Sequence, residues 1–287
     1  MTPADATARH VAFRLTYAQT TPRRAVPRAQ SPTLIESDYA RILVGWVAQW
    51  RASLEPLVQS LPDLLAGARR HRMDDTEQGR RLRAALERGR YAIARHAQIA
   101  DGVAERTGRL VANHQKQEFA KQTRAALGVD VPTLDRSVPT LVGHFAHANA
   151  QRIQSLGENA LAEVGRIVGD GFTNDRTADE IAADIHERFN VAESYARRLA
   201  HDQITKLDAQ VARARHEELG IVTFRWFAYG DARPSHLVKR DRIFPYRGSR
   251  APGFFPGEEY GCRCKAIPVF DEIRMKAGIG RGRQRIV

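Results

Sequence analysis

The sequence predicts an α+β protein, with an elongated, mainly α-helical N-terminal part followed by a small, loop-rich α+β C-terminal domain. Two long stretches in the first half carry apolar residues three and four positions apart, which predicts helices. Residues 221–228 alternate between apolar and polar side chains, which predicts a strand. The segment after that strand is rich in glycine, proline and aromatic residues and therefore predicts compact loops.

We expect four consecutive parts: a flexible basic arm (1–33), a helical domain (34–135), a second domain (136–270) and a basic tail (271–287). A length of 287 residues exceeds the ~100 to 150 that are usual for one domain. Three prolines and the lack of apolar periodicity in 20–33 predict an extended, mobile arm. Prolines and short polar residues over 130–139 predict the connection between the domains.

The first helical pattern runs from Ile42 to Leu64 and places Trp46 and Trp50 on the same stripe as the leucines. We therefore expect both tryptophans to be core residues and not a ligand platform. Pro56 should break or kink this helix. The second pattern runs from about 76 to 127, has Leu110 on its apolar side and stops at Gly128.

The second half predicts three shorter helices before the strand. A helical pattern covers 141–168, and Thr177 with Glu180 forms a capping box that starts a short helix. A further helix carries Leu199, Gln203, Ile204, Leu207 and Val211 and ends at Gly220. In the strand that follows, Val222, Phe224 and Trp226 should share one face.

The net charge of +12 predicts attraction to polyanions, above all to nucleic acid. The arm holds five arginines and one aspartate, and the tail holds five basic and two acidic residues. Our candidates for non-specific DNA contact are Arg23, Arg24, Arg28, Arg281, Arg283 and Arg285. No apolar run approaches the ~20 residues that cross a bilayer, and the N-terminus lacks a secretory signal, so we expect no membrane contact.

A metal site is one interpretation of the C-terminal residues. Cys262, Cys264 and His236 could bind zinc together with Asp231 or Asp241. On a strand the two thiols would lie on one face about 6.6 Å apart, which disfavours a disulfide. The C-x-C spacing is shorter than that of most zinc-binding cysteine pairs, so we expect structural thiols and no cofactor, with zinc as the open alternative.

A catalytic interpretation would make His236 a general acid or base, oriented by Asp231, with Arg233 stabilising an anion, as in a toxin-like nuclease or hydrolase. No nucleophile, phosphate-binding loop or paired carboxylates accompany these residues. Asp231 could instead cap the short helix after Pro234, and Arg233 could pair locally. We therefore expect a structural role and not an enzyme.

Residues 199–264 resemble the phage Mu F-like head morphogenesis family. The resemblance rests on an A-x-D-Q helix, a glycine, a Trp-bearing strand, an Asp-Arg-His group and a closing C-R-C. The matching residues are Ala200, Asp202, Gln203, Gly220, Trp226, Asp231, Arg233, Pro234, His236, Phe244, Pro256, Cys262, Arg263 and Cys264. His201, the Asp241–Arg242 pair and the short Asp231 to Arg233 spacing depart from the family pattern.

The resemblance implies a minor head (capsid) protein of a tailed bacteriophage or prophage. Such a protein acts in head morphogenesis near the portal, with portal, capsid or scaffold proteins as partners and a possible part in DNA packaging or ejection. It would reside in the virion head and, during assembly, in the cytoplasm of the bacterial host. The motif residues would form a structural scaffold: Asp202, Gln203, Trp226, Asp231, Arg233, His236, Asp241 and Arg263. A toxin-like nuclease that uses His236 and Arg233, and a zinc-stabilised DNA-binding protein, are the alternatives.

Overall fold

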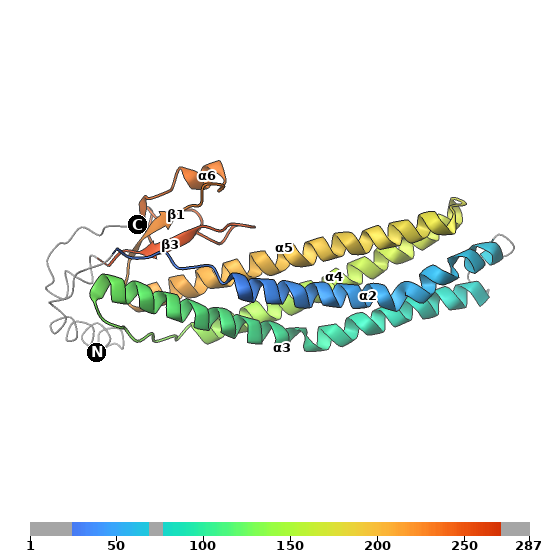
Figure 1. Cartoon of the computed structure of the whole chain (residues 1–287), viewed down its shortest axis with the longest axis horizontal. Helices are drawn as coiled ribbons and strands as arrows, with labels where there is room; N and C mark the ends of the chain where they lie inside the picture. The colour runs from blue at the N-terminus through green and yellow to red at the C-terminus, as the bar shows by residue number, and fades with distance from the viewer. Residues whose placement is uncertain (1–24, 69–76, 271–287) are drawn as a thin grey trace. The chain divides into compact units, whose positions relative to one another are not determined.

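A computed structural model describes residues 25–68 and 77–270 (Figure 1). In this part of the chain the order of elements is α2 (Thr33–Ala68), α3 (Glu77–Leu127), α4 (Val138–Thr173), α5 (Ala178–Glu218), β1 (Thr223–Phe227), α6 (Pro234–Leu237), β2 (Ile243–Pro245) and β3 (Lys265–Pro268). Helices dominate, and the small sheet lies near the C-terminus, so the predicted α+β class is confirmed. None of the helices described is both long enough and apolar enough to span a bilayer.

The chain forms two compact units, each built from separate segments. Unit 1 comprises Arg106–Phe145 with the described parts of Met1–Ile35 and Asp202–Val287. Unit 2 comprises Glu36–Glu105 and Ala146–His201. The sequence led us to expect consecutive domains instead, with a boundary near 135 that falls inside unit 1. Periodicity along the chain locates helices but does not reveal which parts of them pack together.

The core of unit 2 consists of the apolar stripe predicted on α2 and its partners. Trp50 is buried, and its indole Nε1 donates a hydrogen bond of 2.9 Å to His96 Nδ1, while Trp46 stacks on the same imidazole. Both tryptophans are thus core residues, as predicted. Helix α2 continues through Pro56 and Pro62, so the predicted break at Pro56 is absent.

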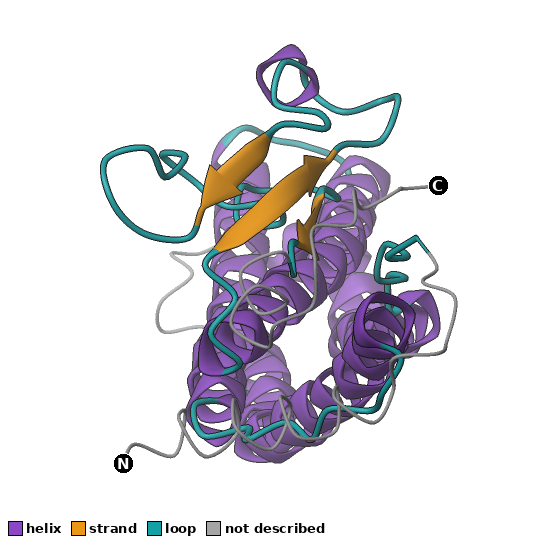
Figure 2. Ribbon diagram, turned by 90° about the vertical axis from the view of Figure 1, so that its left-hand side faces the viewer, coloured by secondary structure: helices purple, strands orange, loops and turns teal. Residues whose placement is uncertain are grey.

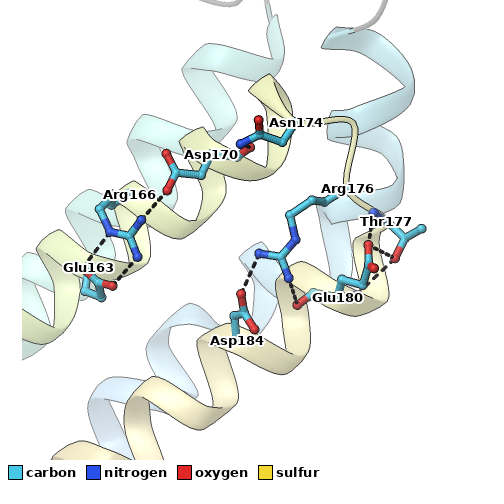
Figure 3. A network of polar contacts seen from close by, with 8 residues as sticks. All are labelled: Glu163, Arg166, Asp170, Asn174, Arg176, Thr177, Glu180 and Asp184. Carbon is cyan, nitrogen blue, oxygen red and sulfur yellow. Dashed lines mark hydrogen bonds and ion pairs between the residues drawn. The ribbon is translucent and has the colours of Figure 1, made fainter.

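A polar network surrounds the turn between α4 and α5 (Figure 3). The Thr177 main-chain N–H and hydroxyl donate to Glu180 Oε2 at 2.8 and 2.9 Å, which confirms the predicted capping box. Arg176 Nη1 donates to Asp184 Oδ2 at 2.6 Å, and Arg166 bridges Glu163 and Asp170. These contacts determine where α5 begins.

Helix α5 is one helix of 41 residues, and not the two helices predicted around the capping box and Leu199. Between these regions no proline or glycine occurs, and buried alanines at 192, 196 and 200 extend the apolar stripe. Three further residues assigned to apolar faces are exposed: Ile42 (39%), Leu110 (51%) and Val222 (43%), the last of which precedes the first residue of β1.

The sheet of unit 1 has the order β2-β1-β3, with both pairings antiparallel (Figure 2). Phe224 and Trp226 of β1 are fully buried, which agrees with the prediction that they share one face of the strand. Phe224 lies opposite Phe244 of β2 and Pro268 of β3. The core around the sheet also includes Phe119, Leu127, Tyr246, Cys262, Cys264, Ile267 and Phe270.

Residues 25–32 are extended but packed, which corrects the prediction of a mobile arm for this part. Val26 is fully buried in the core of unit 1. The Gln30 main-chain N–H donates to Glu118 Oε2 at 2.8 Å, and Gln122 Nε2 donates to the Pro27 carbonyl at 3.0 Å. Side chains of α3 therefore hold this segment, a pairing that no local pattern indicates. The rest of the predicted arm, and the tail, lie outside the described residues.

Candidate functional site

The fold brings His236, Cys262 and Cys264 together in the core of unit 1. Each sulfur lies 3.4 Å from His236 Nδ1, and the three potential ligand atoms all lie within 4.8 Å of one another. The three residues are between 1% and 4% exposed. Among the described residues, this is the group of histidine, cysteine and acidic side chains with the spacing of a metal site. We call it the His-Cys-Cys cluster.

Neither cysteine lies on a strand, although we considered both on one when we disfavoured a disulfide. Strand β3 begins at Lys265, so Cys262 and Cys264 lie in the irregular segment immediately before it. An irregular backbone lets both side chains point at one atom, whereas a strand would hold them about 6.6 Å apart. Both thiols are free.

His236 is positioned by the short helix α6. Pro234 occupies the first turn of α6, where the fixed φ of proline favours a helix start. The His236 imidazole packs against the edge of Trp226, with ring centroids 5.8 Å apart, and against Phe254 at 5.1 Å. Aromatic packing thus limits the ring to an orientation in which Nδ1 faces the sulfurs.

Glu259 binds the other side of the imidazole. His236 Nε2 lies 2.6 Å from Glu259 Oε2, and Arg233 contacts the same carboxylate at 3.4 Å and the Tyr260 carbonyl at 2.5 Å. A carboxylate at Nε2 favours the tautomer with a proton on Nε2 and the lone pair on Nδ1. Glu259 therefore has the orienting role that the catalytic interpretation gave to Asp231.

Asp231 and Asp241 do not belong to the cluster, although the sequence offered either as a fourth metal ligand. Asp231 forms an ion pair with Arg263, so it neither orients His236 nor caps α6, whose first turn has no side-chain cap. Asp241 adopts a left-handed backbone, with φ of 62°, and its N–H donates to the Trp226 carbonyl at 2.8 Å. Both aspartates thus have structural partners.

Asp202 anchors the segment that carries the cysteines. Its Oδ1 accepts a hydrogen bond of 2.9 Å from the main-chain N–H of Gly261, one residue before Cys262. Its Oδ2 accepts from Gln203 at 2.9 Å and from Lys206 at 2.7 Å. Gly261 has a positive φ of 66°, which glycine adopts without strain. The Asp-Gln pair of the sequence motif therefore fixes the loop that leads into the C-R-C triplet.

Gly257 approaches the cluster from the same loop. Its main-chain N–H donates to Cys262 Sγ at 3.3 Å, and a Cβ at this position would lie 2.7 Å from Ala209 Cβ. Hydrogen bonds from Cys264 and from the Gly257 N–H lower the pKa of the Cys262 thiol, while donation to Cys262 and burial raise the pKa of Cys264.

Sequence reasoning missed two ion pairs of unit 1 whose basic side chains are buried. Lys265 Nζ lies 2.5 Å from Asp208 Oδ2, and both side chains are buried. Arg215 Nε lies 2.7 Å from Asp135 Oδ1, and Arg215 also donates to the Ala112 carbonyl and to Gln115. One indication of these pairs was present in the sequence, because Asp208 and Arg215 lie beside the apolar stripe of α5. Nothing in the sequence indicated Glu259.

Of the six predicted DNA-contact residues, Arg28 alone lies in the part of the chain that the structure describes. Arg28 packs over the rings of Phe227 and Tyr229, at 4.9 and 5.1 Å from their centroids, so it has a structural partner. Arg23, Arg24, Arg281, Arg283 and Arg285 lie outside the described residues.

Comparison with known proteins gives one relative. An uncharacterized protein of Haemophilus influenzae is 32% identical over 159 residues, which is 54% of this chain and 36% of that protein. The chain thus spans about a third of the relative's length. No family model matches the chain, and no solved structure matches it.

Proposed function

We propose that this protein is a minor head protein of a tailed bacteriophage or prophage and acts in head morphogenesis. One observation carries the proposal: several residues of the resemblance to the Mu F-like family, far apart within 199–264, contact one another or the loop that carries the cysteines. Asp202 contacts the loop before Cys262, His236 contacts both cysteines, and Arg263 contacts Asp231. This is what a structural motif requires.

The partners of His236 favour a structural role over a catalytic one. The imidazole is 1% exposed, and both ring nitrogens face protein groups. A general acid or base must reach a substrate within hydrogen-bond distance, directly or through one water. The rate of DNA cleavage by the purified chain and by His236→Gln tests this structural role. We expect both rates to be equal and no higher than background.

The proposal is tested in particles. A phage or prophage that encodes this chain is induced, and mature heads are purified and analysed by quantitative mass spectrometry. We expect the protein in heads at few copies relative to the major capsid protein, and we expect it to co-purify with the portal protein when the two are co-expressed. Its presence in the lysate but absence from purified heads would refute the assignment.

Non-specific binding to packaged DNA fits the charge distribution within this proposal. Residues 1–24 hold four arginines and one aspartate, and 271–287 hold five basic and two acidic residues. When a protein binds phosphates, the logarithm of its affinity falls linearly with the logarithm of the salt concentration. A chain of residues 25–270 keeps the packed segment with Val26 and should show a flatter salt dependence than the full chain. An unchanged slope would show that the ends do not bind DNA.

A further inference from the structure

We propose that His236 Nδ1, Cys262 Sγ and Cys264 Sγ bind one thiophilic divalent cation of the zinc type in tetrahedral coordination. The three ligands come from α6 and from the segment before β3. The inference does not depend on the proposed function, since a metal could stabilise unit 1 in any setting.

The two sulfur-to-nitrogen distances in the cluster match those of a metal-centred tetrahedron. Zinc binds sulfur at ~2.3 Å and nitrogen at ~2.0 to 2.1 Å, so a tetrahedral angle separates the two ligand atoms by about 3.6 Å. Both sulfur-to-Nδ1 distances are 3.4 Å. Without a metal, the single lone pair of Nδ1 can accept a hydrogen bond from one thiol and not from both. A cation satisfies all three atoms together.

The surroundings are those of a metal site and not of isolated thiols. Glu259 accepts from Nε2, and metal-bound histidines commonly donate their second nitrogen to a carboxylate. The Gly257 N–H donates to Cys262 Sγ, as an N–H does to a thiolate ligand. Trp226, which packs with Cys264 in the same buried cluster, is fully buried, and its Nε1 has no hydrogen-bond partner among the described residues.

The donor set selects the class of metal. Two sulfurs and one imidazole favour zinc and similar soft or borderline cations over magnesium and calcium, which prefer oxygen. Three protein ligands leave the fourth position of the tetrahedron to a non-protein ligand such as water. The metal would join residues 26 and 28 positions apart in a segment with little regular structure. Its binding energy would add directly to the folding energy of this segment.

The test uses the full chain, purified under reducing conditions, stripped with a chelator and reloaded with zinc. Elemental analysis after desalting should give one zinc per chain. Cobalt(II) in place of zinc should give the sulfur-to-cobalt charge-transfer band and the strong visible bands of tetrahedral coordination. Because this measurement uses the wild-type chain, it does not depend on how a variant folds.

Substitutions assign the ligands. Cys262→Ser, Cys264→Ser and His236→Gln should each lose stoichiometric zinc, and the cysteine variants should weaken the charge-transfer band. Glu259→Gln should lower zinc affinity by about 10- to 100-fold and keep the spectrum, because it changes only the partner of a ligand. Asp231→Asn and His147→Gln are the matched controls and should bind zinc as the wild type does.

Two results would overturn the site. One is a zinc content well below one per chain after reloading, together with a cobalt complex that lacks the charge-transfer band. The other is stoichiometric zinc in both Cys262→Ser and Cys264→Ser with spectra like that of the wild type, which would place the metal elsewhere. Circular dichroism confirms for each variant that the long helices are intact.

Discussion

Units 1 and 2 are stabilised in different ways. Unit 2 buries a continuous apolar stripe, and its arginine–carboxylate pairs around Arg166 and Arg176 are at least partly exposed. Unit 1 buries charged and polar groups among its aromatic residues, including the Asp208–Lys265 pair, Arg215 and His216. A buried charge without its partner costs far more than an exposed one. Substitutions of polar residues should therefore be much more damaging in unit 1.

The largest effect is expected at the Asp208–Lys265 pair. Lys265→Met removes the ammonium group and leaves the Asp208 carboxylate buried without its partner. Breaking a buried pair in this way costs roughly 3 to 5 kcal/mol of the free energy of unfolding. Denaturant titration followed by the fluorescence of Trp226 and the other tryptophans measures this loss.

Two variants serve as controls for this pair. Asp208→Leu combined with Lys265→Met should recover most of the loss, because apolar replacement of both partners removes the buried charge. Lys206→Met should cost less than Lys265→Met, since Lys206 is partly exposed and Asp202 keeps two other donors. Equal stability of Lys265→Met and the wild type would contradict the comparison between the units.

The second effect is a pH dependence from His216. Burial lowers the pKa of His216 from 6.5 to about 3, and Arg215 contributes; the ring contacts Tyr246 and Phe119. The unfolded chain therefore binds a proton below pH 6.5 that the folded chain does not bind until about pH 3. Stability should rise with pH across this window and fall as the solution is acidified, by about 1.4 kcal/mol per pH unit.

His216→Gln isolates this contribution, because glutamine does not titrate. Between pH 6.5 and 4.5 the unfolding free energy of this variant should depend less steeply on pH than that of the wild type. The difference in slope should correspond to close to one proton taken up on unfolding. Burial raises and arginine partners lower the pKa values of Asp135 and Glu217, with a net lowering; both carboxylates are present in the two proteins, so their contribution cancels in the comparison. Parallel profiles of unfolding free energy against pH for the two proteins would show that His216 is not buried in its neutral form.

A moderate effect is expected in unit 2 from the capping box. Thr177→Ala removes the hydroxyl that exchanges hydrogen bonds with Glu180, and the loss of such a cap costs ~1 kcal/mol. Thr177→Ser keeps the hydroxyl and should be close to the wild type. Thermal unfolding by circular dichroism measures both, and equal loss in the two variants would exclude the cap as the cause.

The smallest effect is expected at Arg166, although this residue makes two ion pairs. Its side chain is 59% exposed, and those of Glu163 and Asp170 are 37% and 50% exposed. Exposed pairs contribute roughly 0 to 1 kcal/mol. Arg166→Ala should therefore change the denaturation midpoint little, and high salt should abolish the difference. A loss as large as that of Lys265→Met would remove the contrast between the units.

The same contrast explains how much the sequence could predict. In unit 2 the stabilising residues recur with the period of a helix, so the Trp46 and Trp50 stripe and the Thr177 cap were identified correctly. The strand with Phe224 and Trp226 was also found, because alternation is a local signal. The continuity of α5 was missed, since buried alanines carry little weight in an apolar pattern.

The site in unit 1 could be predicted only in part. His236, Cys262 and Cys264 were singled out as residue types, but their convergence depends on an irregular loop that periodicity does not describe. Glu259 and Lys265 form their key contacts 23 and 57 positions away along the chain. Such contacts depend on tertiary packing, and no spacing within one element encodes them.

The discontinuous make-up of the two units has a consequence for folding during synthesis. Unit 2 cannot close until residues up to 201 have left the ribosome, and unit 1 also requires the segment after 202. Contacts between distant segments slow folding, because the loop between them must close first. Fragments cut near residue 135 should consequently be insoluble when produced alone and should regain structure only when both are present together.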